Sequence, residues 1–265
     1  MSTRTDQRPK RQFTSPLRPA FVLSPAAARA IDRRCVARFG ISTLVLMENA
    51  SVHIAAAAMQ LSPAGTVPSI LLVAGTGNNG GDALAAARHL ANAGATVSLL
   101  LVGDTSKLSS DAAAQLKTCR SMRLAITTAR SSLEKALPAA LRRLGSGWPH
   151  VVVDGLFGTG LSREVDGVAL ETIRVINGLR AKGARVVAID IPSGLDASSG
   201  KPLGGAVYAD MTVTFVGLKT GMLASEAIPY LGRVAIAEIG VPWSLIESLG
   251  KPLKSKAATT RRGRI

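Results

Sequence analysis

The chain has 265 residues, of which 47% are hydrophobic and 18% charged, a composition typical of a globular protein with a core rather than of a disordered chain. The formal net charge of +15 is concentrated at the ends, because residues 1–38 carry +7 and residues 250–265 carry +6, which leaves +2 between them. Only 3% of the residues are aromatic, so the stacking side chains of a nucleic-acid-binding surface are scarce. Specific nucleic-acid binding by the core is therefore disfavoured, and the charge pattern predicts solvated basic ends.

The two cysteines, Cys35 and Cys119, lie far apart and form no Cys-x-x-Cys pair, so no disulfide framework or zinc site is predicted and the reducing cytoplasm is the expected compartment. No uninterrupted apolar run reaches the ~18 to 20 residues that span a bilayer, so no membrane segment is expected. The first twenty residues lack the apolar stretch of a secretory signal but are rich in Arg, Ser and Thr, which leaves organelle targeting open. We expect a disordered basic leader over 1–20, one domain over 21–250 and a disordered basic tail over 251–265.

Two helices are predicted ahead of the first long strand. Ser24 and Pro25 combine an N-cap with a proline at the first helical position, and apolar residues then recur every four positions as far as Phe39, just before Gly40. A second helix is predicted over about 43–60. Neither helix carries an obvious catalytic motif, but their content of Ala, Leu and Met suits a subunit interface, so a homodimer is expected.

From residue 69 onward, short β-branched and Leu-rich runs alternate with segments of helical periodicity. This alternation predicts an α/β fold: a three-layer α/β/α sandwich with a Rossmann-like, mostly parallel sheet, preceded by the two amino-terminal helices. The last two strands lack a clear helix between them and are expected to extend one edge of the sheet. Strands are predicted over 69–74, 96–102, 123–127, 150–154, 185–190, 208–215 and 233–239, and helices over about 82–93, 109–120, 131–144 and 168–182.

The loop after the first of these strands, GTGNNGGD at residues 75–82, has the G-x-G-x-x-G spacing of a dinucleotide-binding turn. Asp82 disfavours that interpretation, because its charge would oppose a pyrophosphate at the start of the following helix. Asn78 and Asn79 offer amide oxygens and donors suited to a cation or to hydroxyl groups. The simpler alternatives are that Asp82 complements the helix dipole and that the asparagines are turn residues.

Two further loops follow strands and repeat this pattern. Residues 154–167, DGLFGTGLSREVDG, open with Asp154 and continue with glycines, while residues 190–196, DIPSGLD, place Ser193 close to Asp190. Ligands of open α/β sheets bind beyond the carboxyl ends of the strands, where such loops converge. The two carboxylates are expected to meet the Ser193 hydroxyl and the asparagines of the first loop there, and converging oxygen ligands indicate a hard cation.

The motifs GTGNNGGD, VVVDGLFGTGLSREVDG, AIDIPSGLD, ADMTVTFVGLKTG and GRVAIAEIGVP, together with the early LMENA, resemble those of the NAD(P)H-hydrate epimerases, the YjeF amino-terminal domain family. The resemblance is ordered and spans most of residues 23–243. Thr76 stands where the family usually has proline, and Ala83 where it usually has glycine. Many members of the family also carry a carboxyl-terminal kinase-like dehydratase domain, which is not expected in this sequence.

The resemblance implies interconversion of the R and S forms of hydrated NADH and NADPH, damaged cofactors with a hydroxyl at C6 of the nicotinamide ring. It also implies a potassium ion as cofactor, a small-molecule substrate and a separate NAD(P)H-hydrate dehydratase as functional partner. Potassium would be bound by Asn79, Asp154 and Ser193. The implied substrate-binding residues are Asn78, Asn79, Gly80, Gly81, Asp82, Gly158, Thr159, Gly160, Leu161, Ser162, Arg163, Glu164 and Asp190.

A mechanism follows from the chemistry of the substrate. The C6 hydroxyl is on a carbon next to the ring nitrogen, so its protonation allows water to leave and an iminium cation to form. Nearby carboxylates would stabilise this cation, and water could return to either face. We assign Asp190 as the acid and base.

Other readings remain open. A nicotinamide-dependent dehydrogenase would place Asp104 roughly where a ribose-binding acid is expected, and a non-catalytic module could keep the fold for ligand or protein binding. Arg163 is either a phosphate-binding residue or a solvated loop cation. The role of Lys219 is undetermined, and the scattered histidines, His53, His89 and His150, are assigned no catalytic or metal role.

Overall fold

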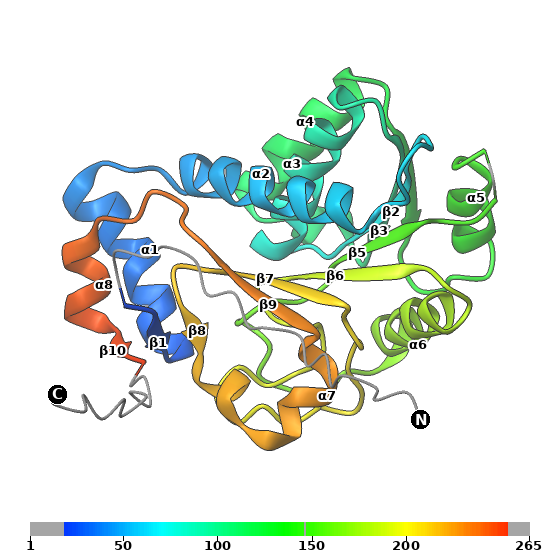
Figure 1. Ribbon diagram of the computed structural model, residues 1–265. Coiled ribbons are helices and arrows are strands. Elements are labelled where there is room, and N and C mark those ends of the chain that lie inside the picture. The colour runs from blue at the N-terminus through cyan, green and yellow to red at the C-terminus, as the bar shows by residue number, and fades with distance from the viewer. Residues whose placement is uncertain (1–18, 146, 254–265) are drawn as a thin grey trace, which may run out of the picture.

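The computed structural model describes residues 19–145 and 147–253. At its centre is a seven-stranded sheet in which every neighbouring pair of strands is parallel (Figure 1). Its strands are β2 (Ser69–Ala74), β3 (Thr96–Val102), β4 (Ala125–Ala129), β5 (Val151–Gly155), β6 (Arg185–Ile189), β7 (Met211–Phe215) and β9 (Arg233–Ala237). The strand order is β4-β3-β2-β5-β6-β7-β9, so successive strands are added toward one edge from β2 to β4 and toward the other edge from β5 onward. The last two strands, β7 and β9, lie at that second edge, as predicted.

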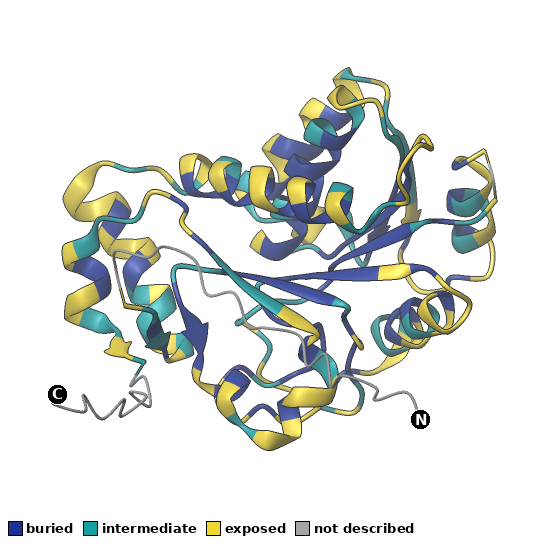
Figure 2. Ribbon diagram, viewed as in Figure 1, coloured by how far each residue is buried: buried dark blue, intermediate teal, exposed yellow. Residues whose placement is uncertain are grey.

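Helices cover both faces of this sheet, which confirms the three-layer prediction (Figure 1). One face carries α2 (Thr43–Leu61), α3 (Asn78–Asn92) and α4 (Ser110–Ser121), and the other carries α5 (Ala136–Arg142) and α6 (Gly167–Ala181). Figure 2 shows the buried residues gathered along the strands and on the inward sides of these helices. The central strands are apolar on both faces because both are covered.

Helix α2 is long and apolar enough to cross a bilayer when judged by length and composition alone. In the fold one side of the helix is buried against α3 and the strands below, while Leu44, Val45 and Val52 on the helix are exposed. The buried residues of the helix include Leu46, Met47, Ile54 and Ala58. The environment of these side chains accounts for the hydropathy of the helix.

A second, small sheet closes one end of the molecule and was not predicted. It consists of β10 (Lys251–Pro252), β1 (Phe21–Leu23) and β8 (Leu218–Lys219), in that order. Helices α1 (Pro25–Phe39) and α8 (Trp243–Leu249) pack beside it. The short segments η1 (Thr105–Lys107), η2 (Thr220–Leu223), η3 (Ser225–Ala227) and α7 (Ile228–Leu231) complete the chain.

The small sheet corrects the expected domain end. The expected boundary after residue 250 is too early, because Lys251 and Pro252 pair with β1, and the Leu253 amide donates to the Ala20 carbonyl at 2.7 Å. Backbone pairing at the chain end is not visible as a hydrophobic pattern, which explains the error. The remaining predictions for the basic ends concern residues 1–18 and 254–265, which lie outside the described residues.

Two element boundaries differ from the predictions because of local backbone constraints. Helix α3 begins at Asn78 rather than near residue 82, because Gly77 already serves as its N-cap. Strand β4 begins at Ala125 rather than 123, because Arg123 adopts a φ of 58° that ends α4. Helix α5 is also shorter than predicted, since it covers Ala136–Arg142 instead of 131–144.

The pairing of β10 with β1 leads to a prediction about truncated chains. A chain of residues 19–253 should unfold cooperatively with a midpoint close to that of the full-length protein. Ending the chain after residue 249 should lower the midpoint by roughly 2–4 °C for each kcal/mol of strand pairing lost. Thermal unfolding followed by circular dichroism measures both, and equal midpoints for the two truncated chains would show that β10 adds no stability.

Candidate active site

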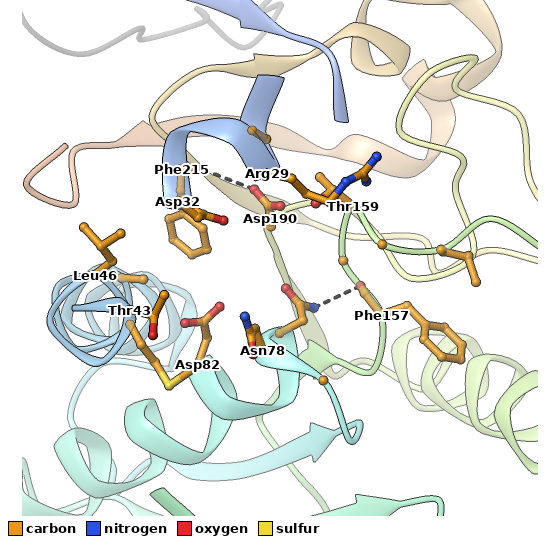
Figure 3. A pocket seen from close by; sticks show the side chains of 18 of the residues that line it. Arg29, Asp32, Thr43, Leu46, Asn78, Asp82, Phe157, Thr159, Asp190 and Phe215 are labelled. Carbon is orange, nitrogen blue, oxygen red and sulfur yellow. Dashed lines mark hydrogen bonds between the residues drawn. The ribbon is translucent and has the colours of Figure 1, made fainter. Parts of the chain in front are cut away.

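A cavity of about 540 Å³ lies at the carboxyl ends of the central strands, where the strand order reverses between β2 and β5. This is the place where open α/β sheets bind ligands. The loops after β2 and β5 form its floor, and α1 and the start of α2 form the opposite wall (Figure 3). The cavity therefore lies between the loops that were predicted to bind a ligand and helix α1, for which no function was predicted.

The structure brings most of the predicted substrate-binding residues to this cavity. Those that line it are Asn78, Asn79, Asp82, Gly158, Thr159, Gly160, Leu161, Ser162, Arg163 and Asp190. Gly80 and Gly81 lie inside α3 and do not line it, and Glu164 is exposed outside it. The predicted convergence of the three loops is thus observed, with three positions displaced from the cavity wall.

The glycines of the first loop serve packing more than ligand approach. A Cβ atom on Gly75 would lie 2.1 Å from the Leu156 carbonyl oxygen, and one on Gly80 would lie 2.0 Å from the Gly75 carbonyl oxygen. Only Gly77 of the three has open space around it, and it lines the cavity. The G-x-G-x-x-G spacing here lets α3 and the loop after β5 approach β2 closely, so it does not by itself indicate a dinucleotide.

Asp154, Ser193 and Asn79 form a buried cluster, with exposed fractions of 0%, 1% and 9%. The Ser193 hydroxyl donates to Asp154 Oδ1 at 2.6 Å, and the Ser193 amide donates to Oδ2 at 2.8 Å. The Phe157 amide in turn donates to Ser193 Oγ at 2.8 Å, and Asn79 Nδ2 donates to the Phe157 carbonyl at 2.9 Å. The predicted ion-binding residues therefore connect the loops after β2, β5 and β6.

The Asp154 carboxylate has no positive partner among the described residues. It accepts hydrogen bonds from Ser193 and from the Leu156 amide, which are neutral groups. Burial raises the pKa of Asp154 to about 6, although these hydrogen bonds oppose the rise. A buried carboxylate without a counter-charge, beside amide, hydroxyl and carbonyl oxygens, fits a hard cation.

Asp190 lies where β6 ends, one residue beyond the strand, and faces the cavity (Figure 3). Its φ of 63° is left-handed, a conformation that Asp tolerates better than most residues. Its Oδ1 atom accepts from Thr214 Oγ1 at 3.3 Å and from the Phe215 amide at 3.4 Å. Lys219 Nζ lies 2.5 Å from the same oxygen, which gives the lysine of undetermined role a contact with the candidate catalytic residue.

Three more carboxyl groups, those of Asp32, Asp82 and Asp111, line the cavity with Asp190. Burial raises the pKa of Asp82 well above its usual value, and the charges of Asp190, Asp32 and Asp111 add to the effect. Desolvation likewise raises the pKa of Asp32, with a contribution from Asp190, while Lys219 lowers it. The cavity thus gathers four carboxyl groups around a small volume, together with the cations Arg29, Arg163 and Lys219. Where one of these carboxyl groups is ionised, it would stabilise a cation bound beside it.

Sequence reasoning missed the contribution of the amino-terminal helices. Arg29 and Asp32 both line the cavity, three positions apart on one face of α1. Thr43 and Met47 add the start of α2. The spacing of Arg29 and Asp32 is visible in the sequence, but the apolar positions that bury the other side of the helix give the stronger pattern there.

Asp104, the residue on which the dehydrogenase alternative depended, lies away from the cavity. Its side chain accepts from the Ser106 amide at 3.1 Å, at the start of η1, and it pairs with Arg130 at 3.1 Å. Asp82, in contrast, is within α3, where a pyrophosphate would approach the helix start in a dehydrogenase. Both placements disfavour that alternative.

Comparison with known proteins adds an independent line of evidence. A family model described as "YjeF-related protein N-terminus" matches residues 43–221. A protein of Limosilactobacillus fermentum named NAD(P)H-hydrate epimerase is 36% identical over 216 residues, covering 82% of this chain and 95% of that protein. A Thermofilum pendens protein named bifunctional NAD(P)H-hydrate repair enzyme Nnr is 36% identical over 219 residues, covering 83% of this chain and 40% of that protein. The crystal structure of yeast YNL200c has a TM-score of 0.68 at 20% identity, covers 89% of this chain and 97% of that chain, and shares the fold.

Proposed function

The chain belongs to the YjeF amino-terminal family, and we propose that it interconverts the R and S forms of hydrated NADH and NADPH, as an isomerase that repairs damaged cofactors. The observation that carries this proposal is the convergence of Asp190, Asp82 and Asp32 on one cavity at the strand-order reversal. A reaction through a cation needs such a negative surrounding. The names of the relatives supply the substrate class.

The chain's own carboxylates account for the chemistry. Protonation of the C6 hydroxyl lets water leave, the lone pair of the ring nitrogen forms the iminium cation, and water then adds to either face with loss of a proton. Asp190, beside the cavity, exchanges these protons, and the neighbouring carboxylates stabilise the cation. The loop residues 158–163 and Asn78 hold the rest of the substrate, with Arg163 available to a phosphate.

Replacing Asp190 tests the chemical assignment. Asp190→Asn should lower the epimerisation rate by about 10² to 10⁴-fold while substrate affinity stays within about tenfold, because the amide keeps the shape but cannot exchange a proton. Asn also tolerates the left-handed backbone, but the buried Lys219 loses its charged partner, so thermal unfolding of the variant is measured alongside the rate to establish that it is folded at the assay temperature. The measurement is the chromatographically followed equilibration of purified S hydrate, corrected for its spontaneous drift.

The matched control is Asp166→Asn, because Asp166 is an exposed acid at the start of α6 whose side chain makes no capping hydrogen bond. That variant should keep the wild-type rate. A wild-type rate in Asp190→Asn would show that another group carries the proton. Ligand binding without any turnover by the wild-type protein would instead support the non-catalytic module.

We further propose that a potassium ion is bound by Asn79, Asp154 and Ser193. A single buried carboxylate with neutral oxygens around it matches the charge of a monovalent ion. The ion would orient the three loops and leave proton exchange to Asp190. Without a cation, the raised pKa of Asp154 means that the folded protein loses stability as the pH rises through about 6, and a bound ion would offset this loss.

Potassium should therefore raise the unfolding midpoint more at pH 7.5 than at pH 5, where a proton occupies Asp154. Thermal shift in KCl against tetramethylammonium chloride at equal ionic strength measures the effect. Asp154→Asn should abolish the difference between the two salts. Identical responses to both salts at pH 7.5 would rule out the site.

A homodimer through the amino-terminal helices is proposed from their exposed apolar side chains, which are Val36, Phe39, Leu44, Val45 and Val52. Val45→Glu should yield a monomer by light scattering after gel filtration. Val67→Glu is the control, because Val67 is equally apolar and 64% exposed but precedes β2. A wild-type protein that is monomeric at every concentration would contradict the dimer.

The product of this reaction would be used by an NAD(P)H-hydrate dehydratase. The relatives named as bifunctional repair enzymes match this chain over 40% and 42% of their length. The dehydratase is therefore proposed as the functional partner. Both cysteines are free thiols, and the proposed compartment is the reducing cytoplasm.

A further inference from the structure

Lys219 is the largest of the fully buried side chains, with 2% of its surface exposed. Its Nζ atom contacts four oxygens: Asp190 Oδ1 at 2.5 Å, Thr214 Oγ1 at 2.8 Å, the Phe215 carbonyl at 3.1 Å and the Gly217 carbonyl at 3.2 Å. An ammonium group is costly to bury unless its charge is paired and its N–H groups are bonded. The surrounding oxygens meet both requirements.

Two of these four oxygens, which together we call the oxygen cage, are carbonyls of the loop between β7 and β8, and the backbone of this loop is strained. Val216 has a φ of 67°, and the Gly217 amide donates to the Phe215 carbonyl at 2.7 Å, which together define a γ-turn. A β-branched residue rarely adopts this conformation, and strained backbone concentrates at functional sites. The turn leaves the carbonyls on both sides of Val216 within reach of the lysine.

Asp190 occupies a matching turn at the end of β6. The Ile191 amide donates to the Ile189 carbonyl at 2.7 Å across Asp190, and the Asp190 amide donates to the Val213 carbonyl at 2.7 Å. All the side-chain contacts described for Asp190 involve Oδ1. The second oxygen, Oδ2, takes part in none of them, while the side chain faces the cavity (Figure 3).

We propose that Lys219 is a positioning residue that acts through Asp190, holding Oδ1 so that a charged carboxylate presents Oδ2 to the substrate. This inference rests on the proposed epimerase function. The charged groups that line the cavity together with Asp190 are Lys219 from β8, Arg29 and Asp32 from α1, Asp82 from α3, Asp111 from α4 and Arg163 from the loop after β5. Of these groups, Lys219 is in direct contact with Asp190.

A charged Asp190 at the start of the cycle accepts the proton of the returning water. This refines the assignment of both protons to Asp190: the proton that departs with the hydroxyl then comes from another carboxyl, and Asp82 lines the same cavity. Burial and three neighbouring carboxylates favour the neutral form of Asp82. The cycle is balanced when Asp190 returns its proton to Asp82 through solvent.

A double-variant cycle tests whether Lys219 works through Asp190. Lys219→Met should lower kcat by about 10- to 100-fold, leave KM within about threefold and move the acidic limb of the pH–rate profile to higher pH. In the Asp190→Asn background the same substitution should cause no further loss, because the group it positions is already inactive. An equal loss in both backgrounds, or an unmoved pH limb, would overturn the proposal.

A pair of threonine variants keeps the test decisive if Lys219→Met does not fold. Thr214→Val removes the hydroxyl that contacts both Lys219 and Asp190, and Thr212→Val removes an equally buried hydroxyl on the same strand that bonds the Leu231 carbonyl at 2.7 Å. Both should lose stability, but only Thr214→Val should shift the pH limb. Equal shifts in the two variants would contradict a specific role.

Failure of the proposed function is distinguishable from failure of this inference. If the wild-type protein does not epimerise hydrates, crystal structures of the wild type and Thr214→Val still report the orientation of Asp190. A carboxylate that turns away from its wild-type position supports positioning by the cage of Lys219 and Thr214. A carboxylate that keeps its position overturns it, whatever reaction the site performs.

Discussion

The geometry of the cavity depends on one buried carboxylate, Asp154, at the end of the central strand β5. Its two oxygens bind the amide and hydroxyl of Ser193, and Ser193 in turn binds the Phe157 amide. These bonds fix the loops after β5 and β6 relative to each other, and Asn79 adds the loop after β2. An isolated charge is costly in such a place, so the arrangement favours structures in which a cation or a proton accompanies the carboxylate.

Part of the opposite wall of the cavity, contributed by α1, precedes the region matched by the family model, which begins at residue 43. Strand β1 pairs in parallel with β8, and its Leu23 lies opposite Lys219 in the register. The same segment leads into α1, which brings Arg29 and Asp32 to the cavity. The amino-terminal segment thus supports the lysine by backbone pairing and also supplies charged groups of its own to the ligand.

The chain is strongly basic, yet the side chains of four carboxylic acids, Asp32, Asp82, Asp111 and Asp190, line one cavity beside Arg29, Arg163 and Lys219. Screening confines most electrostatic influence between exposed charges to about 8–10 Å at physiological ionic strength. The charged groups that line the cavity, rather than the net charge of +15, therefore determine which ligand charge it favours.

The layers, the strands and the convergence of three loops could be predicted from sequence, because continuous apolar runs alternate with helical periods and each loop combines glycines with a polar side chain. Elements such as β1, β8 and β10 are too short to show a period, and only their pairing defines them. The role of Arg29 and Asp32 depends on how α1 is folded back over the sheet edge. The sequence shows Lys219 close to the end of a predicted strand, but its contact with Asp190 depends on a left-handed turn at Val216, which residue propensities do not predict.

The backbone and the chemistry together restrict the residue at position 190. Its left-handed φ of 63° favours Gly, Asn or Asp, because a short polar side chain tolerates this region and longer or branched ones are strained. Of these three only Asp carries the charge that the buried Lys219 needs, since an ammonium without a partner would destabilise the core. The proposed proton exchange requires the same residue. The backbone conformation, the ion pair with Lys219 and the proposed proton exchange are thus all satisfied by Asp at position 190.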